Sequence, residues 1–121
     1  MACLTCKPSV RFKDFPPAMI AILSGLSAVA RATATVPELV ITSANDSTHA
    51  PTSRHYAGEA VDIRSKHFPS AAAREAFAAA LRQQLGPAFT VLLEDDGGPN
   101  EHLHIQPKKG TAYVVPTERA A

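Results

Sequence analysis

The chain has 121 residues, of which 19% are charged and 45% are hydrophobic, and its formal net charge is +1. This length fits one domain with a modest core, and the composition is typical of globular proteins. The Lys and Arg residues are scattered, so nucleic-acid binding through a basic face is not expected. Two Tyr, five Phe and no Trp argue against an aromatic platform for stacking bases or sugars.

Residues 1–14 are expected to form an irregular N-terminal arm, and residues 15–121 a single domain. Cys3 and Cys6 form a Cys-x-x-Cys motif in this arm. Half of a zinc knuckle and a redox pair both have this spacing, but no second ligand pair follows at a suitable distance. A thioredoxin-like motif would open a helix, whereas this one precedes Lys7-Pro8. The simplest interpretation is two thiols in a loose terminus.

Residues 18–30 are the most apolar stretch, but they are too few to span a bilayer. Basic residues before it and the Ala-Arg-Ala-Thr-Ala run at 30–34 resemble a secretion signal. Pro16-Pro17 at its entrance favours instead an amphipathic core helix running to about Arg31. The apolar stripe of that helix would consist of Met19, Ile20, Ile22, Leu23 and Leu26. No clear targeting segment and no membrane span are therefore predicted.

The remaining pattern predicts an α+β fold. Strands are expected at 38–43, 60–64, 89–94 and 102–106, the last two joined as a hairpin through a Gly-containing turn at 95–100. Ser70 can cap a helix that runs through Leu85 and stops at Gly86-Pro87. Residues 44–58 are rich in turn formers and predict a long loop. We expect a small antiparallel sheet with helices packed mainly on one face.

Three residues in two short segments have the donor groups of a catalytic zinc site: His55, Asp62 and His104. Two imidazoles and one carboxylate leave a fourth position open for water. Gly58 allows the loop to turn so that His55 can lie beside Asp62. An aspartate in an apolar strand also needs compensation.

The alternative for Asp62 is a salt bridge with Arg54 or Arg64. Strand alternation places His102 and His104 on one sheet face, with Leu103 and Ile105 on the other. Considered alone, such a His-x-His pair is more often a surface feature than a metal site.

The motif Ser-x-His-x-x-Gly-x-Ala-x-Asp is complete from Ser53 to Asp62, and Glu101-x-x-His104 follows late in the chain. This combination resembles the zinc peptidases of bacterial cell walls. That family includes D-alanyl-D-alanine carboxypeptidases and dipeptidases, L-alanyl-D-glutamate endopeptidases of phage lysins, and the related hedgehog domains. The resemblance is loose over residues 42–106 and close over the motif positions. It implies a hedgehog/D-Ala-D-Ala peptidase-like fold.

The resemblance implies one zinc ion per chain, held by His55, Asp62 and His104. It also implies that Glu101 is the general base that accepts the proton of the attacking water and passes it to the leaving amine. Glu94, at the end of the neighbouring predicted strand, is a competing base. The Glu-x-x-His spacing favours Glu101.

Two further histidines are candidates for catalytic roles. His102 could hold the substrate or stabilise the oxyanion, or be merely a supporting polar residue. His49 resembles a site histidine of some family members, although a solvent-exposed loop histidine is the alternative. Several members carry an upstream arginine for the oxyanion, but no Arg occurs between Ala32 and Ser53. Arg54 or Arg31 would have to substitute for it.

The expected function is a zinc metallopeptidase that hydrolyses peptidoglycan stem peptides, as a D-Ala–D-Ala carboxypeptidase or an L-Ala–D-Glu endopeptidase. We expect a monomer that is cytoplasmic on synthesis and acts at the bacterial wall, with a phage origin and a pore-forming partner as one route of export. The alternative is a catalytically weak or inactive zinc-containing binding module of the same fold. A third hypothesis places Cys3 and Cys6 in a zinc-dependent assembly surface.

Overall fold

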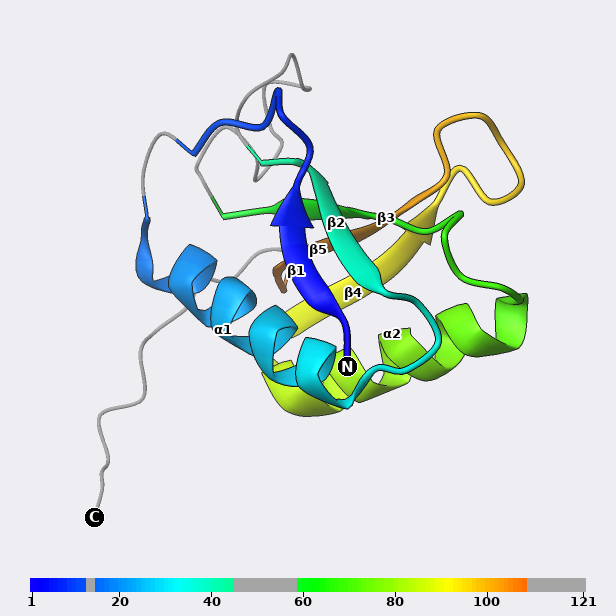
Figure 1. The fold of residues 1–121 in the computed structure, drawn as a ribbon. Coiled ribbons are helices and arrows are strands. Elements are labelled where there is room, and N and C mark those ends of the chain that lie inside the picture. The colour runs from blue at the N-terminus through cyan, green and yellow to red at the C-terminus, as the bar shows by residue number, and fades with distance from the viewer. Residues whose placement is uncertain (13–14, 45–58, 109–121) are drawn as a thin grey trace.

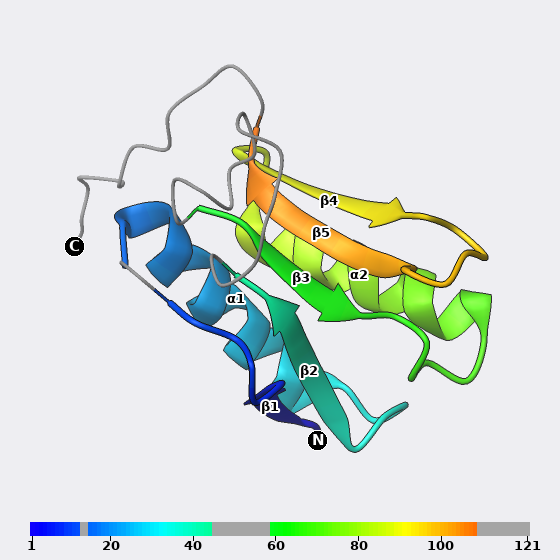
Figure 2. The same cartoon turned by 90° about the horizontal axis from the view of Figure 1, so that it is seen from above.

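The computed structural model describes residues 1–12, 15–44 and 59–108. The elements are β1 (Cys3–Cys6), α1 (Pro17–Ala32), β2 (Glu38–Ser43), β3 (Val61–Arg64), α2 (Ala71–Leu85), β4 (Phe89–Glu94) and β5 (His102–Pro107). The strands form one sheet in the order β1-β2-β3-β5-β4. Both helices lie against the same face of the sheet (Figures 1 and 2). The predicted α+β class with helices on one face is therefore confirmed, and we call the opposite face the open face.

Helix α1 supplies much of the core. Met19, Ile22, Leu26 and Val29 recur at helical spacing and are at most 6% exposed. Burying each large apolar side chain contributes roughly 1.5–3 kcal/mol. The predicted helix is confirmed, but Ile20 is wrongly placed in the stripe: it is 53% exposed, because one residue beyond Met19 the side chain points about 100° away.

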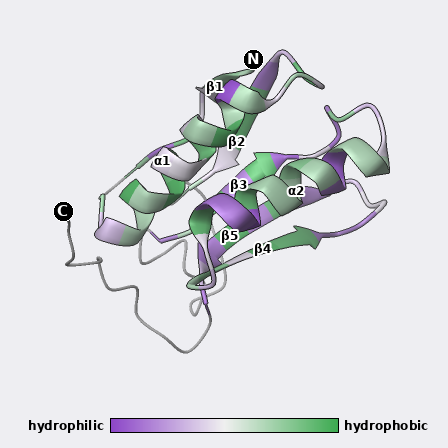
Figure 3. Cartoon of the chain, turned by 90° about the horizontal axis from the view of Figure 1, so that it is seen from below, coloured by the Kyte–Doolittle hydropathy of each residue, from purple (hydrophilic) through white to green (hydrophobic). Residues whose placement is uncertain are grey.

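Helix α2 follows its predicted signals. The hydroxyl of Ser70 accepts a hydrogen bond from the backbone N–H of Ala73, and Gly86 ends the helix with a positive φ of 83°. Phe77 and Leu81 are buried toward the sheet. Figure 3 shows both helices from below, in front of the sheet, with α1 largely hydrophobic and α2 carrying hydrophilic segments.

Two expectations about the N-terminus and the sheet are wrong. Residues 3–6 are not an irregular arm, because they form edge strand β1, which pairs with β2 in parallel. The sheet is therefore mixed, not antiparallel. A parallel pair needs a crossover connection, and α1 provides it between β1 and β2. Ala2 is 6% exposed and Leu4 packs against the core, which ties this segment down.

The other strand pairs are antiparallel: β2 with β3, β3 with β5, and β4 with β5. The hairpin of β4 and β5 is confirmed. Within the described ranges, neither helix has the length and hydrophobicity that crossing a membrane requires.

Candidate metal centre

The centre is built on the paired strands β3 and β5. Their register sets Asp62 opposite His104 and Ile63 opposite Leu103. Alternation sends Ile63 and Leu103 into the core, where both are 0% exposed, and turns Asp62 and His104 to the open face. His102 shares that face with His104. The predicted division of this strand into a histidine face and an apolar face is confirmed.

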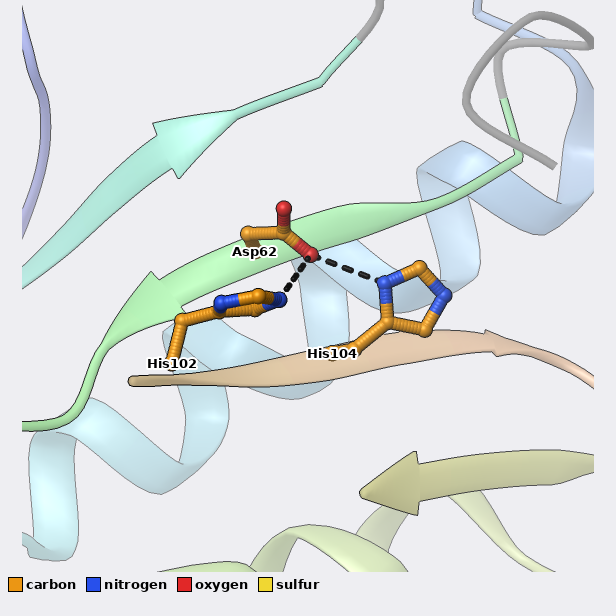
Figure 4. A group of neighbouring side chains, drawn as sticks. All are labelled: Asp62, His102 and His104. Carbon is orange, nitrogen blue, oxygen red and sulfur yellow. Dashed lines mark hydrogen bonds and ion pairs between the residues drawn. The ribbon is translucent and has the colours of Figure 1, made fainter. Parts of the chain in front are cut away.

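The carboxylate of Asp62 lies between the two imidazoles (Figure 4). Its Oδ1 is 2.8 Å from Nδ1 of His104 and 3.5 Å from Nε2 of His102. One donor atom from each of the three residues lies within 4.8 Å of the others. Ligands 2.0–2.1 Å from a tetrahedral zinc stand about 3.3 Å apart, so these contacts are close to that spacing. The three residues could therefore bind a metal ion.

A second contact orients each imidazole. Nε2 of His104 is 2.7 Å from Oε1 of Gln106, and Nδ1 of His102 is 2.6 Å from the carbonyl oxygen of Asn100. When those nitrogens donate to the oxygens, the other nitrogen of each ring presents its lone pair toward Asp62. This is the tautomer that metal binding needs. In that tautomer the donor set would fit a metal in orientation as well as in identity.

The pKa of His104 has two opposing influences. Burial acts to lower it, whereas hydrogen bonds to Asp62 and Gln106 act to raise it, and the net pKa is raised. A proton held by Nδ1 in the metal-free protein occupies the position that a metal would take. Protons and metal ions must compete at this atom.

Glu94 also reaches the cluster. Its Oε1 lies 2.9 Å from Nε2 of His102 and 4.0 Å from Nδ1 of His104, and its side chain is 45% exposed. Register explains this contact, since Glu94 is the β4 partner of His102.

Glu101 is held by groups from three segments. Its carboxylate accepts hydrogen bonds from the hydroxyl of Ser65 at 2.7 Å and from the backbone N–H of Gly97 at 2.9 Å. The guanidinium of Arg74 is 3.9 Å away. The hydrogen bond from Ser65, followed by the one from Gly97, lowers the pKa of Glu101. The group is therefore an ionised carboxylate at neutral pH.

An open cavity of about 660 Å³ adjoins the cluster. Asp62, His102 and Glu101 all line it, so the proposed base and two members of the cluster face the same space. The remaining lining residues are Lys7, Thr42, Ser43, Arg64, Lys66, Pro99 and Asn100.

The structure brings together Asp62 and His104, adds His102 to the cluster, and places Glu101 on the shared cavity. His55 and His49 lie outside the described residues, as does Arg54. No ion pair joins Asp62 to Arg64, whose Nη1 instead lies 3.2 Å from Nε2 of His67.

Arg31 is in the last turn of α1, and it does not line this cavity. Cys3 and Cys6 are exposed free thiols three positions apart on β1, so their side chains point to opposite faces of the strand. That geometry does not favour a metal site shared by the two thiols.

Sequence reasoning missed Gln106 and Ser65. Gln106 was within reach of the alternation argument, because it lies two residues beyond His104 on the same strand face. No local sequence pattern links Ser65 to Glu101, because the two residues are 36 positions apart.

Comparison with protein-family models, curated proteins and solved structures gives no match. The resemblance to cell-wall peptidases therefore rests on the motif residues alone.

Proposed function

We propose that this protein is a zinc-dependent metallopeptidase that hydrolyses peptide bonds of peptidoglycan stem peptides. The observation that carries the proposal is the contact between Asp62 and His104 on the open face, beside a cavity that Glu101 also lines. Imidazole and carboxylate donors in this combination suit zinc. The motif from Ser53 to Asp62 supports the substrate class, and it is the basis for assigning His55 as a further ligand.

The hedgehog/D-Ala-D-Ala peptidase-like arrangement belongs to the same proposal. Support comes from the two-layer α+β architecture and from a donor cluster on the helix-free face of the sheet. Action at the bacterial wall as a monomer, with export through a pore-forming partner, is the corresponding biological setting.

A zinc ion held by His55, Asp62 and His104 would polarise the scissile carbonyl and lower the pKa of the attacking water. Glu101 then accepts the proton of that water at its carboxylate and delivers it to the leaving amine. The hydroxyl of Ser65 and the N–H of Gly97 hold the carboxylate at the cavity wall during both transfers. His102 lines the same cavity and would contact the substrate there. The role of His49 remains a prediction from the sequence.

A zinc-containing binding module is the second candidate, and one observation favours it. Both carboxylate oxygens of Glu101 already accept a hydrogen bond, and the lowered pKa makes this group a weaker base. A chain that retains the ligands but uses Glu101 to brace the β4–β5 turn would bind a peptide without cleaving it.

The experiment is a digest of purified muropeptides by the zinc-loaded full chain, read by mass spectrometry with and without a chelator. Glu101→Gln keeps the shape of the side chain and removes the base. We expect it to slow hydrolysis by about 100- to 10,000-fold with zinc still bound. Glu38→Gln is the matched control, because Glu38 is an exposed glutamate on β2 outside the cavity lining.

Two other outcomes would redirect the assignment. If the wild-type chain cleaves no muropeptide in a chelator-sensitive way, the peptidase proposal fails and the binding module is preferred. If Glu94→Gln abolishes cleavage while Glu101→Gln does not, Glu94 is the base. The masses of the products identify the bond that is cut.

A further inference from the structure

Three cationic side chains line the cavity beside the Asp62–His102 edge of the cluster: Lys7, Arg64 and Lys66. Lys7 directly follows β1, Arg64 ends β3, and Lys66 lies just beyond it. Segments distant in the sequence thus bring positive charge to one cavity. Arg64 is two residues from Asp62 on the same strand and is the register partner of His102, so it lies on the open face next to the cluster.

Among the residues that the structure describes, no carboxylate of the cavity forms an ion pair with these cations, although Lys66 is close enough to Glu101 to act on it electrostatically. Asp62 contacts the two imidazoles, and Glu101 is bound by Ser65 and Gly97. Within the described ranges, no carboxylate lies within ion-pair distance of Lys7, Arg64 or Lys66. The cavity therefore presents positive charge, above all that of Lys7 and Arg64, toward the space that a substrate would occupy.

Clefts lined by cations concentrate anionic ligands, and a guanidinium can donate two parallel hydrogen bonds to a carboxylate. Resting on the proposed peptidase function, we propose that Lys7, Arg64 and Lys66 form a subsite for a carboxylate of the peptide substrate, with Arg64 as its main donor. Two carboxylates of a stem peptide have this chemistry. One is the C-terminal carboxylate, and the other is the α-carboxylate of a γ-linked D-Glu.

Arg64 is the main donor because it is the least exposed of the three cations. It is half-buried, whereas Lys7 and Lys66 are exposed. Less water competes for a half-buried guanidinium, so each hydrogen bond to a carboxylate contributes more. The two lysines then act mainly as nearby charges.

The test measures binding, without hydrolysis, by titrating isotope-labelled full chain in the presence of a chelator and following amide chemical shifts. Three probes separate the two carboxylates: diacetyl-L-Lys-D-Ala-D-Ala, its C-terminal amide, and a diacetylated L-Ala-γ-D-Glu-L-Lys amide. The first carries only a C-terminal carboxylate, and the third only the D-Glu carboxylate. We expect one of these two to bind about tenfold or more tightly than the uncharged amide.

Arg64→Gln should abolish that preference, while Lys7→Met and Lys66→Met should each weaken binding about two- to fivefold. Arg64→Lys retains the charge and should keep part of the preference. It tests whether the loss in Arg64→Gln comes from the missing charge rather than from a folding defect. Arg31→Gln is the matched control, because it removes the same charge from an exposed site on α1 outside the cavity.

The subsite is overturned if Arg64→Gln, folded as judged by its amide spectrum, binds all three probes as the wild type does. It is also overturned if the wild type does not distinguish the charged probes from the uncharged one. The proposed function can fail while the subsite stands. In that case carboxylate binding depends on Arg64, but the zinc-loaded chain cleaves no muropeptide.

Discussion

Nδ1 of His104 lies 2.8 Å from Oδ1 of Asp62, across the register pair that joins β5 to β3. The two residues are 42 positions apart in the sequence, and both are 8% exposed. Ile63 and Leu103, on the opposite face of the same two strands, fix the register by packing into the core. The position of the donor atoms is therefore a consequence of core packing.

The first prediction concerns pH and the metal-free fold. Burial works to lower the pKa of His104, but hydrogen bonds to Asp62 and Gln106 raise it overall. A group with a raised folded pKa stabilises the fold fully below its unfolded pKa of about 6.5, and the contribution is lost as pH rises through the folded value. We expect His104→Asn to destabilise the metal-free protein more at about pH 5.5 than at about pH 8.

Denaturant unfolding of both proteins at these two pH values, with a chelator present, measures the difference. An equal loss of unfolding free energy at both would show that His104 does not titrate between them. Metal affinity should have the opposite trend and strengthen as pH rises, because the metal must displace the proton on Nδ1.

The second prediction ranks the carboxylates at the cluster. Asp62→Asn removes a buried carboxylate that would bind the metal directly. We therefore expect zinc affinity to fall by more than about 100-fold, beyond the range typical of residues that contact only the ligands. Glu94→Gln changes a side chain that is 45% exposed and contacts His102, and should weaken zinc by about tenfold or less. Competition titration against a chromogenic chelator measures both. Equal losses in the two variants would mean that Glu94 is itself a ligand.

The third prediction concerns Ser65. Its hydroxyl is the main cause of the lowered pKa of Glu101, ahead of the N–H of Gly97. A carboxylate with a lowered folded pKa contributes stability above its unfolded pKa, and that contribution is lost as pH falls through the folded value. Because Ser65→Ala removes this hydrogen bond, it should raise the pKa of Glu101 and move the acid limb of the kcat/KM profile to higher pH.

Ser65→Thr, which retains a hydroxyl, is the matched control and should keep more of the original profile. A pH–rate profile of muropeptide cleavage reads the shift. If the acid limb does not move in Ser65→Ala, Glu101 is not the group that accepts the proton.

Local signals were sufficient for most of the elements. The cap at Ser70, the stop at Gly86 and the apolar spacing of α1 act within one or two turns of chain, so they are readable without tertiary structure. β1 could not be predicted in this way. Its four residues pair in parallel with a strand beyond α1, and only that pairing and the packing of Leu4 make it a strand.

The same distinction applies to the candidate centre. Alternation along one strand predicted that His102 and His104 share a face, and the same rule extends to Gln106. The contact between Glu101 and Ser65 joins segments that only the folded sheet brings together, so no local pattern announces it. His55 is the ligand for which motif spacing remains the sole argument.

The last prediction tests whether the core positions the cluster. Leu103 lies between His102 and His104 and is 0% exposed, whereas Leu92, the β4 partner of His104, is 48% exposed. Leu103→Ala should lower the free energy of unfolding by about 2–5 kcal/mol through lost burial and a cavity. Leu92→Ala should change it by less than about 1 kcal/mol. Thermal or denaturant unfolding measures both variants.

Zinc titration of the same two proteins then links packing to the site. If the core face sets the positions of the imidazoles, Leu103→Ala should weaken zinc binding while the protein remains folded. Leu92→Ala should not, although Leu92 is the register partner of His104 on the open face. Unchanged affinity in a destabilised Leu103→Ala would mean that the metal itself organises its ligands. In that case register would bring the residues together without presetting their geometry.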